Sequence, residues 1–110
     1  MNATPRFGLV VLATEPTAEI LLRGEVDAEC FPELRAAVAQ LLASPHVKRI
    51  ELDVALTTFC DQADLSALFR TRLAAHECGA ALCLVRVPAY LLRVLDAAGL
   101  TTMLILRRDE

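Results

Sequence analysis

The feature that most constrains the fold is a regular alternation of short apolar runs with segments of helical periodicity. The runs at 49–56 and 80–87 are typical of strands, and each is followed by a segment whose apolar residues recur every three or four positions. Such alternation predicts strand–helix–strand units, whose right-handed crossovers make the joined strands parallel. The chain is therefore expected to form an α/β fold with a largely parallel sheet.

The complete order expected is ββαβαβαβ, in a single domain that spans residues 1–110. A turn-like stretch at 15–17 joins the first two strands as an antiparallel hairpin, so the N-terminal strand is antiparallel to the rest of a sheet that helices cover. Strands are expected near 7–13, 18–23, 48–55, 81–86 and 102–106, and helices near 31–43, 62–77 and 88–98. The core is expected to include Leu52, Val54, Leu65, Leu68, Phe69, Leu84 and Leu95.

Composition narrows the function classes. Hydrophobic residues make up 55% of the chain and charged residues 23%, as in a compact globular domain. The net charge is -3 and the 11 basic residues are scattered, which argues against nucleic acid as a partner. No stretch reaches the roughly 18 apolar residues of a membrane span, so we expect no membrane insertion and a cytoplasmic location.

No recognised catalytic or metal motif is present. The four cysteines form no CxxC pair and lie in apolar contexts, so they are expected to be free and mostly buried thiols. The sequence has no glycine-rich phosphate loop, and His46 and His76 belong to no nucleophile or metal motif. We therefore expect no enzymatic activity, no cofactor and no metal.

Two acidic turns follow predicted strands. Gly24 closes the second strand, Glu25 and Asp27 follow it, and a helix starts at Pro32. Gly24 suits a backbone conformation that other residues resist, and Asp27 suits a cap that accepts backbone N–H groups. Turn chemistry alone therefore accounts for this stretch.

The second turn follows the third strand. Asp61 is expected to cap a helix that begins at Gln62, and Asp64 at the third helical position interacts favourably with the helix dipole. Capping accounts for both acids separately. It does not account for their combination: an exposed strand-to-helix turn that follows two apolar residues, Phe59 and Cys60, and carries two acids on either side of one amide.

The two turns are expected to lie close together, because the carboxyl ends of parallel strands gather at one edge of a sheet. The predicted partner-binding patch is acidic and partly apolar. It consists of Glu25, Asp27, Asp61, Gln62, Ala63 and Asp64. Such a patch suits a protein partner that carries Arg or Lys.

Three stretches carry a family resemblance: "GEVD" (24–27) followed by "FPELRAAV", then "IELDVALTTFCDQADLSALF" (50–69), and "VPAYLLRVLDAAGLTTML" (87–104). Together they resemble the STAS domain (sulphate transporter and anti-sigma factor antagonist) over nearly the whole chain. The middle stretch is similar to the family's strand, Asp-Ser-[Ser/Ala/Thr]-Gly-Leu motif and helix. The resemblance implies the STAS fold and a protein-binding function, most similar to bacterial anti-sigma factor antagonists.

The chain departs from the family at the residues that matter for switching. In bacterial members of this kind, the serine after the Asp is phosphorylated by a kinase-like anti-sigma factor, and the complex then breaks. Here Gln62 occupies the serine position and Asp64 the glycine position. Because Gln62 has no hydroxyl group, the resemblance implies a domain that is not switched by phosphorylation there.

Asp64 has two opposite consequences as a fixed charge near the family's phosphate position. If the partner surface tolerates it, the protein is a permanently active antagonist; if that surface is acidic, Asp64 is a permanent partial phosphomimic that blocks docking. We favour the first, because one surface charge pair is worth no more than about 1 kcal/mol.

Two functions remain open. The first is an anti-sigma factor antagonist that binds an anti-sigma factor or a similar kinase-like regulatory protein. The second is a STAS subunit of an ABC-type lipid transporter that binds the cytoplasmic ATPase. The sequence leaves open the partner, the oligomeric state, and whether Thr57, Thr58 or Ser66 is phosphorylated instead.

Overall fold

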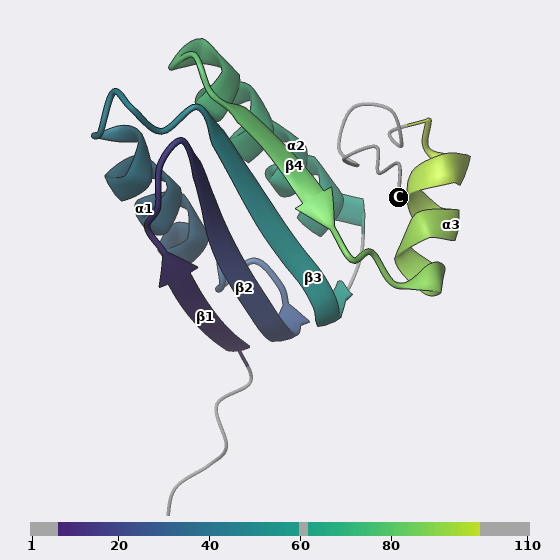
Figure 1. The fold of residues 1–110 in the computed structure, drawn as a ribbon. Coiled ribbons are helices and arrows are strands. Elements are labelled where there is room, and N and C mark those ends of the chain that lie inside the picture. Colours follow the sequence, from purple (N-terminus) through teal and green to yellow (C-terminus); the bar gives the residue numbers. More distant parts are fainter. Residues whose placement is uncertain (1–6, 60–61, 100–110) are drawn as a thin grey trace, which may run out of the picture.

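The computed structural model describes residues 7–59 and 62–99, which form four strands and three helices (Figure 1). The predicted order is confirmed from the first strand to the third helix; the strand expected near 102–106 lies outside the described residues. The elements are β1 (Phe7–Leu12), β2 (Thr17–Val26), α1 (Phe31–Leu42), β3 (Arg49–Phe59), α2 (Gln62–Glu77), β4 (Ala81–Val85) and α3 (Ala89–Ala97).

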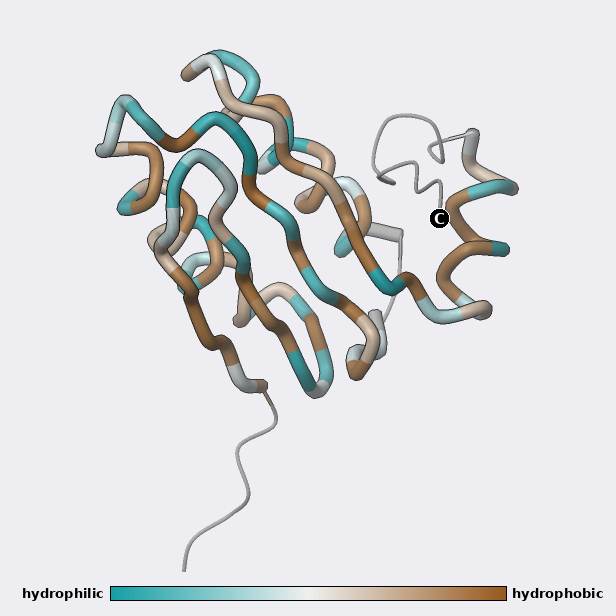
Figure 2. The backbone as a smooth tube through the Cα atoms, in the orientation of Figure 1, coloured by the Kyte–Doolittle hydropathy of each residue, from teal (hydrophilic) through white to brown (hydrophobic). Residues whose placement is uncertain are grey.

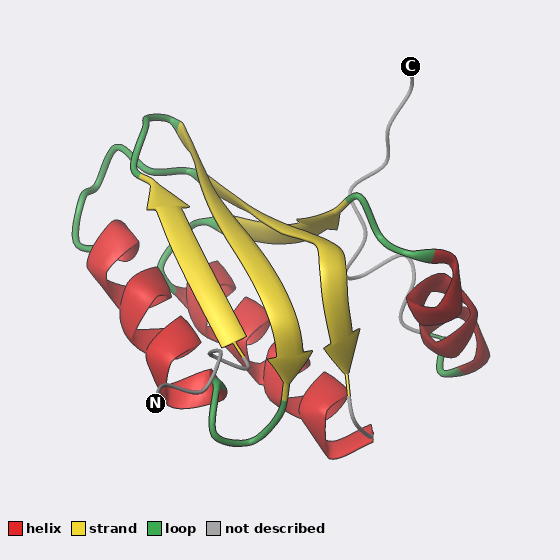
Figure 3. Ribbon diagram, turned by 90° about the horizontal axis from the view of Figure 1, so that it is seen from below, coloured by secondary structure: helices red, strands yellow, loops and turns green. Residues whose placement is uncertain are grey.

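The strands form one mixed sheet in the order β1-β2-β3-β4. β1 is antiparallel to β2, whereas β2, β3 and β4 run parallel to one another, as predicted. Seen from below, α1 and α2 cover one face of this sheet and α3 stands beyond its β4 edge (Figure 3). The carboxyl ends of β2 and β3 therefore lie at one end of the sheet.

The core fills the space between the sheet and the two covering helices. The alternating side chains Ile20, Leu52 and Leu84 from the three parallel strands are 0% exposed, and Leu68 of α2 packs against them, also 0% exposed. Brown and teal segments alternate along β2 and the first half of β3 in Figure 2, as burial on one face requires, whereas β1 and β4 have no teal segment.

Most of the predicted core is confirmed, with one exception on α2. Phe69 is only half-buried, and the guanidinium carbon of Arg72 lies 5.9 Å from the centre of its ring. The buried face of this helix combines two large residues with three small ones: Leu65, Leu68, Ala67, Thr71 and Ala75. Phe69 lies at the rim of this face.

The structure corrects two strand ends. β2 and β3 continue to Val26 and Phe59, beyond the predicted ends at 23 and 55. Gly24 has a φ of 101°, as its predicted conformational role requires, but it lies inside β2 rather than at its end. A positive φ at glycine is compatible with continued pairing, so it did not mark the end of the strand.

The lengthened β3 contains a bulge. Leu21 is opposite Asp53 but Arg23 is opposite Leu56, so β3 carries one extra residue. The bulge brings two consecutive side chains, Ala55 and Leu56, to exposed positions, and Leu56 is 73% exposed. An alternating pattern therefore describes β3 only up to Val54.

The cysteines are less uniformly buried than expected. Cys30 is buried and Cys83 is half-buried, but Cys78 is exposed at the end of α2; Cys60 lies outside the described residues. Burial raises the pKa of the Cys83 thiol, with smaller opposing effects from Arg49. Cys83 is thus less reactive than an exposed thiol at neutral pH.

Replacing Leu68 by alanine tests the packing of α2. Because Leu68 is completely buried, Leu68→Ala is expected to lower the free energy of unfolding by about 2 to 5 kcal/mol, measured by urea denaturation. Leu73→Ala on the same helix is the matched control, since Leu73 is 40% exposed. Equal losses in the two variants would contradict the observed packing of α2.

Candidate functional site

The structure brings together the ends of β2 and β3, the two strands that the predicted acidic turns follow; Cys60 and Asp61 of the second turn lie outside the described residues. The parallel register places Glu25 beside Thr58 and Val26 beside Phe59, at the common end of β2 and β3. The loop to α1 leaves from one of these strands and the start of α2 follows the other. Glu25 and Asp27, at and after the end of β2, and the start of α2 at Gln62 therefore belong to one end of the sheet. We call this end the corner.

The loop between β2 and α1 is held by Asp27 and Cys30. Oδ1 of Asp27 accepts a hydrogen bond from the backbone N–H of Glu29 at 3.0 Å, and the Asp27 carbonyl accepts one from Cys30 N–H at 2.9 Å. The buried Cys30 thiol donates to the Glu25 carbonyl at 3.2 Å and lies 3.4 Å from Asp27 Oδ1. Asp27 thus organises a turn, as predicted, although Cys30 rather than Asp27 is the N-cap residue of α1.

An acidic hollow opens beside this loop. It has a volume of about 230 Å³ and is lined by Phe7, Glu25, Asp27, Glu29, Cys30 and Glu33. Glu25, Glu29 and Glu33 are exposed, so their charges face solvent. Glu29 and Glu33 were not among the predicted patch residues. Their positions could have indicated them, because Glu29 lies two residues after Asp27 in the same turn and Glu33 lies six residues after it, in the first turn of α1.

The start of α2 agrees with the prediction in position but not in exposure. The helix begins at Gln62, with Asp64 in its first turn. Asp64 is only 4% exposed, so it is not the surface charge that the sequence suggested. The bound of about 1 kcal/mol for an exposed pair therefore does not apply to it. Asp61 lies outside the described residues.

The hydroxyl groups near the corner differ in accessibility. Thr57 is 4% exposed and its Oγ1 donates a hydrogen bond to the Val54 carbonyl at 2.9 Å. Thr58 and Ser66 are exposed. Of the three hydroxyls considered as substitute phosphorylation sites, only Thr58 and Ser66 are therefore accessible to a kinase in the folded domain.

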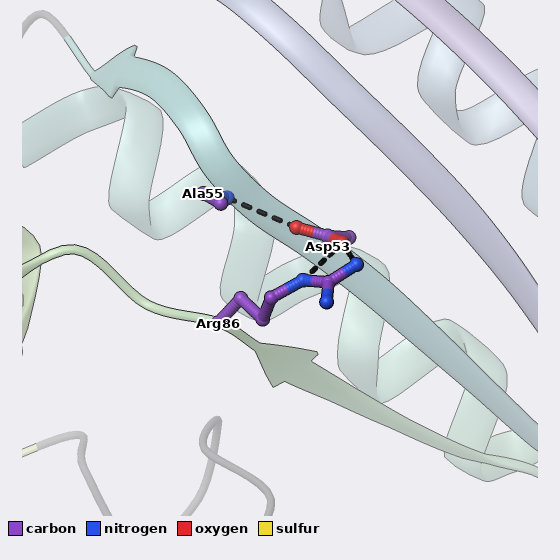
Figure 4. Close-up of polar contacts among 3 residues, drawn as sticks. All are labelled: Asp53, Ala55 and Arg86. Atoms are coloured by element: carbon purple, nitrogen blue, oxygen red, sulfur yellow. Dashed lines mark hydrogen bonds and ion pairs between the residues drawn. The ribbon is translucent and has the colours of Figure 1, made fainter.

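Asp53 and Arg86 form a polar cluster that the sequence did not reveal (Figure 4). Asp53 Oδ2 lies 2.8 Å from Arg86 Nε and 2.6 Å from Nη2, while Oδ1 accepts a hydrogen bond from Ala55 N–H at 3.1 Å. The bond to Asp53, together with its negative charge, raises the pKa of Arg86. In the sequence Asp53 was visible only as a second charged residue, after Glu51, in the strand 50–56.

This cluster fixes the chain where β4 ends. Arg86 follows β4 directly and has a φ of 56°, a left-handed conformation that costs energy for a residue with a side chain. Its guanidinium group crosses to β3, the neighbouring strand, and pairs with a carboxylate that is itself bound to the bulge. The ion pair therefore holds the turn that leads to α3.

A second contact ties α3 to the corner. The hydroxyl group of Tyr90, in the first turn of α3, donates a hydrogen bond to the Thr57 carbonyl at 3.0 Å. β4 pairs with β3 only as far as Asp53, so β4 does not reach Thr57. Tyr90 thus binds a backbone group of β3 beyond the end of β4, and connects α3 to the strand that leads into α2.

Neither a metal site nor a membrane-spanning helix is found in residues 7–59 and 62–99. No group of three or more His, Cys, Asp or Glu side chains there is arranged to hold a metal ion. No helix in the same ranges has the length and apolar character needed to cross a bilayer.

Comparison with known proteins identifies the family. Residues 11–107 match the family described as "Mlab, STAS domain". A search of curated protein sequences finds no match.

Solved structures show the same fold at low sequence identity. An anti-sigma factor antagonist from Mycobacterium paratuberculosis is 18% identical, with a TM-score of 0.73 over 99% of this chain and 92% of that one. The phosphorylated Bacillus cell fate determinant SpoIIAA is 18% identical, with a TM-score of 0.66 over 94% and 92%. The murine anion transporter Slc26a9 is 14% identical, with a TM-score of 0.68 over 81% of this chain and 15% of the transporter.

A double-mutant cycle tests whether Asp53 and Arg86 act as a pair. Asp53→Asn and Arg86→Gln are each expected to lower the urea midpoint of unfolding, because each breaks the ion pair at the bulge. The double variant is expected to lose no more stability than the more harmful single variant. Strictly additive losses would show that the two side chains do not stabilise the fold together.

Proposed function

The chain belongs to the STAS domain family, and from this premise we propose that it is a non-enzymatic regulatory domain that binds another protein, in the manner of an anti-sigma factor antagonist. The observation that carries this proposal is the corner, where the ends of β2 and β3 lie side by side and the acidic hollow opens beside the loop from β2 to α1. The proposed contact residues are Glu25, Asp27, Asp61, Gln62 and Ala63, with the carboxylates of Glu29 and Glu33 added from the structure.

The charge of the corner defines the kind of partner. Four carboxylates line the hollow, and the exposed ones attract Arg or Lys side chains on an approaching protein. Charged groups of this kind mainly raise the association rate and make binding sensitive to salt. We propose an anti-sigma factor or a similar kinase-like regulatory protein as the partner.

We also propose that this domain is not switched by phosphate at the family's usual position. Gln62 has no hydroxyl group to accept a phosphoryl group. Asp64, which is buried in the first turn of α2, acts from inside the helix start rather than through contact with the partner. A carboxylate in this place stabilises the helix through its dipole, which supports a permanently formed corner.

The second candidate is a STAS subunit of an ABC-type lipid transporter that binds the cytoplasmic ATPase. It is favoured by the fold likeness to part of an anion transporter, which shows that this fold also occurs inside transport proteins. Affinity purification of the tagged chain from its native cells separates the two candidates. A kinase-like anti-sigma factor supports the first, and an ABC-type ATPase supports the second.

Charge reversal at the corner tests the docking surface. Glu25→Lys is expected to lower the association rate with the recovered partner by about tenfold, because it repels a basic surface. Glu77→Lys, which makes the same charge change at the far end of α2, is the control and leaves the rate within about twofold of the native value. Equal effects of the two substitutions, measured by surface plasmon resonance, would place the contact elsewhere.

Restoring the family's serine tests the absence of switching. Incubation with ATP and a recovered kinase-like partner is expected to leave the native chain unmodified, whereas Gln62→Ser gains one phosphate at position 62. Intact mass and peptide mapping measure both results. Stoichiometric phosphate on Thr58 or Ser66 of the native chain would show that a neighbouring hydroxyl has taken over the switch.

Replacing Asp64 separates stability from docking. Asp64→Gly is expected to lower the melting temperature, since it removes a buried carboxylate and adds glycine to the first turn of α2. Its affinity for the partner is expected to change by no more than about tenfold, or 1.4 kcal/mol. Tight binding that appears only in Asp64→Gly would identify Asp64 as a built-in phosphomimic.

A further inference from the structure

The outer edge of β1 has the features of a strand that pairs with another chain. In the part of the chain that the structure describes, β1 is the end strand of the sheet and pairs with β2 alone. Its sequence, FGLVVL, has no charge and no proline, the residues that commonly protect an edge strand. Val10 is 58% exposed and Leu12 48%, so the edge is also apolar.

Both faces beside this edge are apolar. On the helix-covered side, Leu9 and Val11 border a groove of about 410 Å³ that α1 closes with Ala37. On the open side of the sheet, Val10 lies opposite Leu21 of β2, which is 36% exposed. An added strand would therefore bury apolar side chains on both faces.

We propose that β1 pairs with β1 of a second copy of this chain, antiparallel and around a two-fold axis at Val10. An isologous contact of this kind is the usual way in which a single edge closes into a dimer. Counted over the described residues, the two sheets would become one continuous sheet of eight strands. Because β1 has no charged residue, this register places no like charges directly opposite each other.

The register also gives charge complementarity at the two ends of the contact. On the open face, Gly8 pairs with Arg23 and Leu12 with Glu19 within one copy. With Val10 opposite Val10 of the second copy, Gly8 lies opposite Leu12 of that copy. At each end of the contact, four residues then lie side by side on neighbouring strands: Arg23 and Gly8 of one copy, followed by Leu12 and Glu19 of the other. The basic Arg23 of one copy and the acidic Glu19 of the other therefore lie on the same row and the same face.

The absence of a side chain at Gly8 leaves room for the Arg23 side chain. The Arg23 side chain lies over it, so that a Cβ atom at position 8 would be 3.1 Å from Arg23 Nε and 3.2 Å from Cγ. Arg23 is thereby directed across β1 towards the edge, and so towards Glu19 of the second copy. Glycine weakens a strand interior, and the passage of Arg23 gives a reason for it here.

The dimer would leave both corners accessible. The corner lies at the carboxyl ends of β2 and β3, next to Phe7 at the start of β1. Antiparallel pairing of β1 with its copy reverses one sheet relative to the other. The two corners would therefore face opposite ends of the continuous sheet, and one dimer would bind two partner molecules.

Sedimentation velocity on the full chain, from micromolar to submillimolar concentration, tests the proposal. A reversible monomer–dimer equilibrium is expected. Val10→Lys is expected to raise the dimer dissociation constant by at least about tenfold, because two lysines meet at the axis. Leu56→Lys is the control, since Leu56 is an exposed apolar residue on β3, and it leaves the equilibrium unchanged.

Charge exchange tests the register. Arg23→Glu and Glu19→Arg are each expected to weaken the dimer, because each leaves like charges facing across the edge. An equimolar mixture of the two variants is expected to form a heterodimer at least as tight as the native dimer, since both ends regain opposite charges. Circular dichroism of each variant verifies folding.

Three results would overturn the proposal. The first is a native chain that remains monomeric at every concentration. The second is a dimer that Val10→Lys does not weaken, which would place the contact on another surface. The third is a dimer in which the mixture of Arg23→Glu and Glu19→Arg is no tighter than either variant alone, which would reject the two-fold axis at Val10.

Discussion

The extra residue in β3 lies where pairing with β4 stops and side-chain contacts from Arg86 and Tyr90 connect β3 to the second half of the domain. Pairing of β3 with β4 stops at Asp53, where the bulge begins, and the side chains of Ala55 and Leu56 are exposed. The backbone N–H group of Ala55 donates a hydrogen bond to the Asp53 carboxylate. The same carboxylate holds Arg86, and through it the turn to α3. Asp53, beside the bulge, is therefore one of the residues that connect β3 to the chain leading to α3.

This arrangement explains how the corner is supported. Beyond the bulge, β3 pairs with β2 on one side, and the Tyr90 hydroxyl group binds the Thr57 carbonyl from the side that β4 does not reach. The thiol of Cys30 holds the neighbouring loop through the Glu25 carbonyl. The acidic hollow thus lies on backbone that is fixed from several directions, which suits a surface that binds without first having to be ordered.

Periodicity predicted the architecture because burial on one face imposes it on every strand and helix. Elements from 7 to 99, the mixed sheet and the adjacency of the ends of β2 and β3 followed from this pattern. The bulge did not, since Glu51 and Asp53 together continue the alternating pattern of β3 and one extra residue after them leaves no signature. Exposure of Asp64 was misjudged because the first turn of a helix is usually at the surface, whereas here Asp64 and Leu65 of that turn are both buried.

The parallel pairing of β2 with β3 also has a kinetic consequence. The corner consists of two segments that the whole of α1 separates along the chain, and only this pairing brings them together. Non-local parallel pairs close later in folding than a hairpin such as β1–β2, because a longer loop must be ordered first. The proposed binding surface therefore forms only when this pairing is made, and a partly unfolded chain that has its hairpin but lacks the β2–β3 pairing does not present it.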